Sequence, residues 1–162
     1  MLQWYVENKN LFESEIASMN MHWPDAQYGF LDDGRMYWKV QIRPIISGKR
    51  KEWIVLAVYC TNYPGEDSFR FYPVHPNYNE MTKMVQLSDV VPKYVPHMFR
   101  DRKQNMCFDI AIPNANLSNN IVESIVPSIN RVARWIYLFE TGMEVPEVWE
   151  LFCGINRGDN CV

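Results

Sequence analysis

Apolar residues recur at helical spacing in the range 8–20, which predicts an amphipathic helix. The apolar stripe has members three or four positions apart, namely Leu11, Phe12, Ile16 and Met19. Glutamate and serine occupy positions between them. Trp23-Pro24 ends the predicted helix, because proline cannot continue the helical hydrogen-bond ladder. One face of this helix is therefore expected to pack on the rest of the domain.

After this helix the spacing of apolar residues changes to two, which predicts strands joined by tight turns. Four ranges are expected to form an antiparallel meander: 28–31, 35–43, 53–60 and 69–74. Asp33-Gly34 lies between the first two ranges and is a strong hairpin signal. The third range is apolar on both alternating faces, as in a central strand covered on two sides, so Cys60 is predicted to be a core thiol. The fourth, shorter strand is predicted to lie at an edge of the sheet.

Regular periodicity disappears in the range 75–119, where prolines recur, so a long and mostly irregular loop is predicted there. Long structured loops in compact domains usually carry function. Pro76 and Asn77, at its start, are expected to turn the chain after the fourth strand.

A second helical stripe follows in the range 121–139 and predicts a long helix. Asn120 and Glu123 have the spacing of a capping box at its start. Pro127 is expected to kink this helix or to separate its first turn. Thr141-Gly142 is expected to end it.

The whole pattern predicts one α+β domain: an N-terminal helix, a four-stranded antiparallel meander, a long loop and C-terminal helices, the last of them short, over 145–152. The 162 residues are 48% hydrophobic and 22% charged, which is typical of a folded domain with its own core. The domain is expected to span 1–153. The small and polar residues 154–162 are expected to form a flexible tail.

Charge and hydropathy exclude several kinds of partner. The net charge of -3 provides no basic footprint for general nucleic-acid binding. No segment approaches the roughly 20 apolar residues of a membrane span, and the N-terminus lacks the pattern of a signal peptide. The protein is therefore expected to be cytoplasmic, with no nucleic acid and no membrane among its partners.

The four cysteines are Cys60, Cys107, Cys153 and Cys161. They form no CxxC pair, and no histidine has the spacing that would complete a zinc site, so no metal is expected. Disulfides are not expected in the cytosol, and Cys153 would pair with Cys161 only in an oxidised sample. Cys153 is predicted to pack in the interior, and Cys161 to be an exposed thiol of the tail.

Cys107 ends a polar loop, 96–109, in the half of the chain without regular periodicity. Arg100, Arg102 and Lys103 precede it, and their positive charge would favour a thiolate if they lie close. A cysteine between apolar neighbours is more often a small buried side chain. Two interpretations therefore stay open for Cys107 at this point: a nucleophile or a packing residue.

Several short motifs accompany this loop. They are Pro96-His97-Met98-Phe99, Asn105-Met106-Cys107-Phe108, residues 134–142 with Trp149, and Tyr63-Pro64 after the third strand. With the predicted order of elements, they resemble the bacterial ubiquitin-conjugating-like proteins of CBASS anti-phage operons, in the short stand-alone form. The resemblance covers residues 11–152. It implies a ubiquitin-conjugating-like fold, an active-site loop and a cysteine acyltransferase that needs neither a metal nor an organic cofactor.

The resemblance also implies a partner and a reaction. Cys107 would form a thioester with the C-terminal carboxylate of a cGAS-like nucleotidyltransferase, and would transfer it to an acceptor amine on a target protein or prime it in anti-phage defence. His97 matches a histidine of the family, and would assist catalysis or only hold the loop through a hydrogen bond. His75-Pro76-Asn77 matches the tripeptide of eukaryotic relatives but lies far before Cys107, so a turn is the preferred explanation for Asn77.

Two other functions fit the same residues. A non-catalytic adaptor of the same fold would bind the nucleotidyltransferase, and Cys107 would then be structural. A thiol-based redox sensor would be oxidised at Cys107 or Cys161, although no nearby resolving cysteine supports this function.

Overall fold

The computed structural model of the chain describes residues 2–65, 68–88, 94–110 and 124–154. Its elements are, in order, α1 (Trp4–Glu7), α2 (Lys9–His22), β1 (Gln27–Phe30), β2 (Met36–Ile42), β3 (Ile45–Ile46), β4 (Lys49–Arg50), β5 (Trp53–Tyr59), β6 (Phe69–His75), α3 (Tyr78–Leu87), β7 (Met98–Arg100), β8 (Met106–Phe108), α4 (Ile125–Glu144) and α5 (Pro146–Cys153). The predicted α+β class is confirmed, because helices pack on a sheet whose neighbouring strands are all antiparallel.

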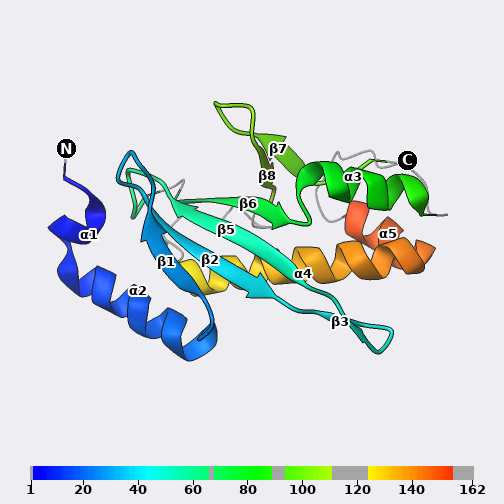
Figure 1. Cartoon of the computed structure of the whole chain (residues 1–162), viewed down its shortest axis with the longest axis horizontal. Coiled ribbons are helices and arrows are strands. Elements are labelled where there is room, and N and C mark those ends of the chain that lie inside the picture. The colour runs from blue at the N-terminus through cyan, green and yellow to red at the C-terminus, as the bar shows by residue number, and fades with distance from the viewer. Residues whose placement is uncertain (1, 66–67, 89–93, 111–123, 155–162) are drawn as a thin grey trace.

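Strands β1, β2, β5 and β6 form one sheet in that order (Figure 1). This is the predicted meander, with β5 between two partners and β6 at an edge. In the first turn, the Asp33 side chain accepts a hydrogen bond from the amide of Arg35. Gly34 follows with a φ of 88°, which glycine adopts without strain. The short strands β3 and β4 extend the next hairpin as a separate ladder.

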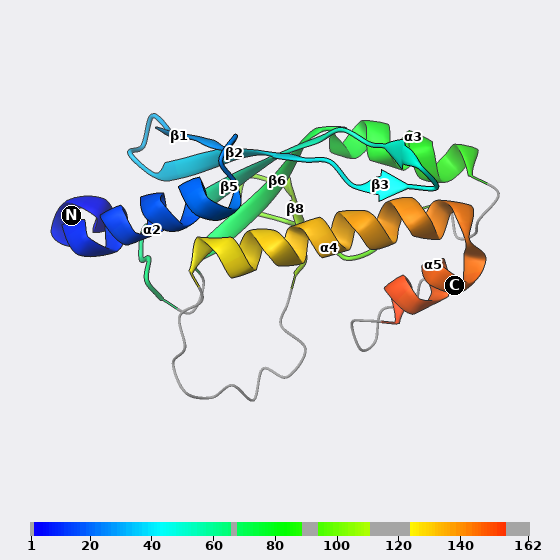
Figure 2. The same cartoon turned by 90° about the horizontal axis from the view of Figure 1, so that it is seen from below.

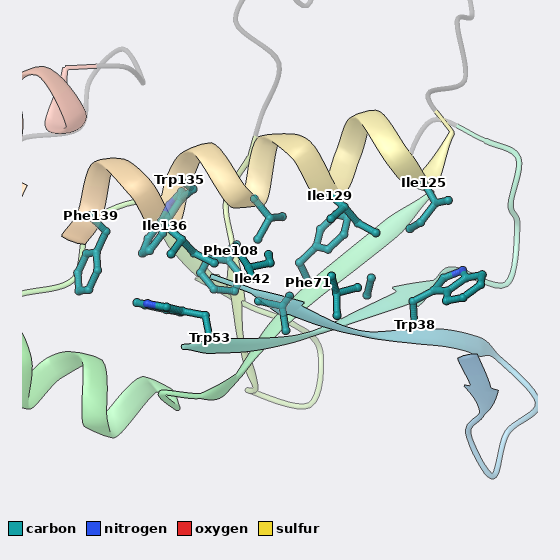
Figure 3. Close-up of a cluster of buried hydrophobic side chains, with 14 of the residues drawn as sticks. Trp38, Ile42, Trp53, Phe71, Phe108, Ile125, Ile129, Trp135, Ile136 and Phe139 are labelled. Atoms are coloured by element: carbon teal, nitrogen blue, oxygen red, sulfur yellow. The ribbon is translucent and has the colours of Figure 1, made fainter. Parts of the chain in front are cut away.

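One face of the sheet carries the core. The register pairs three side chains of β2 with three of β5 on this face: Trp38 with Ala57, Val40 with Val55, and Ile42 with Trp53. All six are at most 3% exposed. Figure 2 shows α2 and α4 on the same side of the sheet, and Figure 3 shows Ile129 and Ile136 of α4 pointing toward it. The sheet is therefore buried from one side by two helices.

The other face of the sheet is only partly covered. Ile54 and Leu56 of β5 point away from the core and are half-buried, because α2 and α4 both lie on the opposite side. Cys60 is also half-buried, so the prediction of a core thiol at this position is wrong. Tyr72 of β6 stands opposite Leu56, and Arg70 lies two positions away, so both belong to this outer face.

Helix α4 continues through both residues that were expected to interrupt it. Pro127 is its third residue, where the backbone amides of a helix have no partner within the helix, so proline is tolerated there. Gly142 lies inside the helix because α5 packs closely on it: a Cβ at this position would be 3.1 Å from Cα of Trp149. The predicted last helix is confirmed as α5. Asn120 and Glu123 lie outside the described residues.

Helix α3 occupies part of the range that was predicted to be irregular. Asn77 and Glu80 form a complete capping box: the Glu80 amide donates to the Asn77 side chain (2.9 Å), and the Asn77 amide donates to the Glu80 side chain (3.2 Å). Met81 and Val85 then bury one side of the helix. The prediction of a loop is therefore wrong for α3 and for the β7–β8 hairpin, while 89–93 and 111–119 lie outside the described residues.

A buried carboxylate joins α2 to the sheet and to α4. Glu15 is 3% exposed. Its Oε2 accepts hydrogen bonds from the Tyr59 hydroxyl (2.7 Å) and the Ile125 amide (3.2 Å), and its Oε1 accepts one from the Tyr63 hydroxyl (3.0 Å). Since Ile125 begins α4, the negative charge also lies at the favourable end of the helix dipole. The helix predicted over 8–20 is thus confirmed as α2, and one of its charged residues fixes the start of α4.

The end of the chain is described only up to Gly154. Phe152 and Cys153 of α5 belong to the core, whereas the predicted tail lies, apart from Gly154, outside the described residues. Among the helices that the structure describes, none has both the length and the apolar character needed to cross a membrane.

Candidate functional site

Cys107 lies in a short hairpin that is closed by its own turn residues. Strands β7 and β8 are antiparallel, and Cys107 stands opposite Phe99. The turn between them depends on Asp101, whose Oδ1 accepts hydrogen bonds from the amides of Lys103 (2.9 Å) and Asn105 (2.8 Å). Aspartate commonly closes turns in this way. The polar residues before Cys107 therefore have a defined structural role.

Adjacent residues of β8 point to opposite sides, as strand geometry requires. Phe108 enters the core, where its ring meets the Trp135 ring edge to face at a centroid distance of 4.8 Å. Cys107 points the other way and interacts with the Tyr72 hydroxyl of β6. The thiol is therefore at the edge of the sheet on its outer face, away from the main core.

The thiol is enclosed by a small polar cluster, which we define as Tyr72, Asp101 and Cys107. The Tyr72 hydroxyl donates a hydrogen bond of 2.8 Å to Oδ2 of Asp101. The Cys107 thiol donates a longer one, 3.7 Å, to the Asn105 carbonyl. Arg70 lies above the Phe99 ring at 5.5 Å from its centroid. The side chain of Cys107 is 0% exposed, so these contacts close the site from solvent.

Burial decides the protonation state of this thiol. Burial raises the pKa of Cys107 to about 11, although the Tyr72 hydrogen bond and the positive charge of Arg70 act in the opposite direction. Partial burial also acts to raise the pKa of Asp101, but hydrogen bonds from Tyr72 and from the turn amides outweigh it and lower that pKa. At neutral pH the cluster therefore holds a protonated thiol beside an ionised carboxylate.

The expected basic neighbours do not provide the charge that acts on Cys107. Arg70, from β6, is the cation that lowers its pKa. Arg100 instead donates a hydrogen bond of 2.9 Å to the Gln104 carbonyl within the turn. Arg102 and Lys103 are exposed. Sequence proximity was therefore a poor guide to the charge around this thiol.

His97 is buried, with its imidazole turned toward α5. Its Nε2 lies 2.6 Å from the Phe152 carbonyl, and its ring packs edge to face on the Phe152 ring. Because a carbonyl only accepts, Nε2 carries a proton in this contact. The His97 backbone carbonyl accepts hydrogen bonds from the Trp135 indole (3.2 Å) and the Asp109 amide (2.8 Å). His97 thus ties the hairpin to α4 and α5, in agreement with the structural role that was one of its two expected roles.

The remaining candidates lie in other environments. Asn77 caps α3, so a structural role accounts for its side chain. Cys153 is buried as predicted, but it is disulfide-bonded, which contradicts the expectation of a reduced thiol. Cys60 and Cys107 form no disulfide, and Cys161 lies outside the described residues. Within the described parts of the chain, no group of three or more potential metal ligands occurs.

Tyr72 and Arg70 were not identified from the sequence. Both lie on the outer side of β6, and the alternation of that strand was a usable signal for their direction. The sequence alone does not indicate that the β7–β8 hairpin packs beside β6.

Comparison with models of protein families, with curated proteins and with solved structures finds no match for this chain.

Proposed function

We propose that this protein is a ubiquitin-conjugating-like acyl carrier in which Cys107 is the nucleophile. It accepts the C-terminal carboxyl group of a partner, a cGAS-like nucleotidyltransferase, as a thioester. It then transfers that group to an amine of a target protein, or holds the partner in a primed state, in anti-phage defence.

The observation that carries the proposal is the polar cluster around Cys107. A free cysteine beside a tyrosine hydroxyl and an ionised carboxylate is an unusual setting for a packing residue. The order of elements also supports it: an N-terminal helix, a four-stranded antiparallel sheet, the cysteine hairpin and a long helix occur in the order that the motif resemblance implies, with α3 added between the sheet and the hairpin.

The reaction requires a donor whose carboxyl group is already activated, as an acyl adenylate or as a thioester on another protein. The Cys107 sulfur bonds to the acyl carbon, AMP or the donor thiol leaves, and the thiol proton passes to the leaving group or to water. An acceptor amine then bonds to the same carbon, the carbon–sulfur bond breaks, and the amine proton restores the thiol.

The raised pKa of Cys107 has two effects on this reaction. It reduces the thiolate available for the first step, so Cys107 reacts only with a strongly activated donor. It also makes the thiolate a poorer leaving group in the second step. The thioester is therefore retained longer, which suits a carrier that holds its partner for a specific acceptor. The ionised Asp101 beside it would attract the incoming ammonium group.

Complete burial of Cys107 supports a second function, that of a non-catalytic adaptor of the same architecture. A thiol that is 0% exposed and protonated at neutral pH is typical of a structural cysteine. In this case the protein binds the nucleotidyltransferase through other surfaces, and Cys107 with Tyr72 only stabilises the hairpin.

An activated peptide separates these two functions without an activating enzyme. The full chain is incubated with a synthetic thioester of the partner's C-terminal peptide and analysed by intact-mass spectrometry. The acyl-carrier proposal requires an adduct that is released by a thiol reagent, is lost in Cys107→Ala, and becomes resistant to thiols in Cys107→Ser. Cys60→Ala is the matched control, because Cys60 is the other described cysteine outside a disulfide and is more exposed.

The adaptor function predicts that Cys107 forms no adduct and is not needed for binding. If the native chain gains no adduct at Cys107, and the nucleotidyltransferase binds wild type and Cys107→Ser equally well, the acyl-carrier proposal is rejected. An adduct that persists in Cys107→Ala and disappears in Cys60→Ala would reject the assignment of the nucleophile.

A further inference from the structure

A groove on another part of the molecule contains a buried carboxylate with an unused oxygen. Two adjoining hollows of about 560 and about 640 Å³ lie between the start of β5, helix α3 and the second half of α4. They share Lys51, Met84, Leu87 and Glu140 in their walls. Figure 1 shows α3 and the orange half of α4 on this side of the molecule, and the Ser88 hydroxyl links them by donating to the Met143 carbonyl. The two hollows therefore form one continuous groove.

Glu140 forms the floor of this groove. Its side chain is buried, with 5% of the residue exposed. The Trp53 indole donates a hydrogen bond of 3.3 Å to Oε2, whereas Oε1 receives no hydrogen bond from any described residue. No cation lies within ion-pair distance of Glu140 in the described chain. Oε1 is not among the fully enclosed polar atoms, so it opens into the groove, where a cation or donor can reach it.

The other acidic residues of the groove already have partners. Glu52 pairs with Arg43 (2.8 Å) and Arg50 (3.6 Å). Glu80 completes the cap of α3. Glu144 accepts a hydrogen bond of 2.8 Å from the Ser47 hydroxyl. Lys51 and Lys83 also line the groove and lie outside ion-pair distance of the described acidic residues, although the charge of Lys51 acts to lower the pKa of Glu140. Glu140 differs from the other acidic residues of the groove in being buried.

The walls beside Glu140 are aliphatic. Met84 and Leu87 come from α3 and Met143 from α4, and Leu87 is 86% exposed although it lines both hollows. Such walls suit an alkyl chain that ends in a charged group, because long charged side chains bury their stem and direct the head to a polar atom. A single free carboxylate oxygen suits a compact ammonium better than a guanidinium, which prefers to bind two oxygens at once.

We infer that this groove binds a lysine side chain of a partner protein, with its aliphatic stem on Met84, Leu87 and Met143 and its ammonium group on Oε1 of Glu140. The inference does not involve Cys107 and does not depend on the acyl-carrier proposal. If the groove does not bind lysine, the acyl-carrier proposal is unaffected. If Cys107 forms no thioester, the inference about the groove is unaffected.

The indole of Trp53 is a direct reporter of this site. The full, ¹⁵N-labelled chain is titrated with N-acetyl-lysine methylamide while the Trp53 indole N–H resonance is followed, with Trp53→Phe to assign it among the six tryptophans. We expect a saturable shift. N-acetyl-norleucine methylamide has the same stem without the charge, and is expected to bind about tenfold more weakly or not at all. Butylammonium has the charged alkyl chain without the peptide groups, so it tests whether the groove binds any alkyl amine or prefers a lysine in a peptide. We expect it to bind more weakly than N-acetyl-lysine methylamide.

The Glu140→Gln variant tests the role of the carboxylate. Glutamine keeps an acceptor for the Trp53 indole but removes the charge, so we expect a folded variant with about tenfold weaker binding of the lysine probe. Glu147→Gln, exposed on α5, is the matched control and is expected to bind as wild type. Equal binding of the norleucine probe, unchanged binding by a folded Glu140→Gln, or tighter binding of butylammonium than of the lysine probe would overturn the inference. The same resonance shifting with N-acetyl-glutamate methylamide would overturn it too, since Lys51 and Lys83 would then form an anion site.

Discussion

The Asp101 carboxylate binds the Tyr72 hydroxyl with one oxygen and closes the β7–β8 turn with the other. Oδ2 accepts the hydrogen bond from Tyr72 at 2.8 Å, while Oδ1 accepts those from the amides of Lys103 and Asn105. One side chain therefore shapes the hairpin and attaches it to β6. Asp101 therefore helps to position Cys107 from the outer side of the hairpin, while Phe108 and His97 hold the hairpin from the core side.

Replacing Tyr72 with phenylalanine is expected to loosen that attachment. The lost hydrogen bond to a charged acceptor should reduce the free energy of unfolding by about 1.5–3 kcal/mol. Urea unfolding measures this change. Tyr37→Phe is the matched control, since the Tyr37 hydroxyl lies on the same sheet face without a hydrogen bond to a described residue. Equal free energies of unfolding for the two variants would contradict the prediction.

The rate of Cys107 alkylation is expected to increase steeply with pH. The thiolate is the reactive form and the pKa of Cys107 is raised to about 11, so the rate should increase about tenfold per pH unit up to that value. Iodoacetamide labelling of the native chain, with the modified peptides quantified by mass spectrometry, gives the profile. Cys60 in the same sample is the internal comparison. A plateau for Cys107 near neutral pH would show that its thiol is activated rather than protected.

Loss of the His97 imidazole is expected to affect stability more than chemistry. His97→Ala leaves the Phe152 carbonyl without its 2.6 Å partner, and should reduce the free energy of unfolding by about 1–3 kcal/mol. Glutamine can present a donor at a similar position, so His97→Gln should recover part of the loss. Thermal unfolding measures both. If a folded His97→Gln variant still formed the thioester at Cys107 but no longer transferred the peptide to an amine, a catalytic role of His97 would replace the structural one.

Removing the Glu15 carboxylate is expected to be the most destabilising of these changes. Glu15→Ala leaves the Tyr59 hydroxyl, the Tyr63 hydroxyl and the Ile125 amide without an acceptor, at about 1–3 kcal/mol for each buried group. Glu13→Ala, exposed on the same helix, should change stability by less than about 0.5 kcal/mol. Urea unfolding provides the comparison. A Glu15→Ala variant as stable as Glu13→Ala would mean that water replaces the carboxylate.

The sheet was predictable because its signals are local. Alternation along β2, the Asp33-Gly34 turn and the uninterrupted apolar run of β5 lie within a few residues of the structure that they specify. The helix α3 had a local signal too, in Asn77 and Glu80, but the prolines around it indicated a loop more strongly. Gly142 was misleading because glycine often ends helices, whereas here close contact with Trp149 requires it inside one.

The candidate site was only half predictable. Cys107 was identified from its motif and its neighbours, but its environment comes from Tyr72 and Arg70, more than thirty positions earlier in the chain. Which hairpin packs on which sheet edge depends on contacts distant in sequence, and a single chain contains no short-range signal for them. For the same reason, the contact between His97 and Phe152 was not foreseen.

The alternation of Cys107 and Phe108 restricts how the turn before them can change. Deleting one residue between 101 and 105 would exchange their directions, so that the phenyl ring would face Tyr72 and the sulfur would face Trp135. Most surface turns tolerate gains and losses of single residues, but this one would tolerate only changes that preserve the alternation, such as insertions of two. The length of the turn should therefore be a more stringent constraint on natural variants than the identity of its exposed residues.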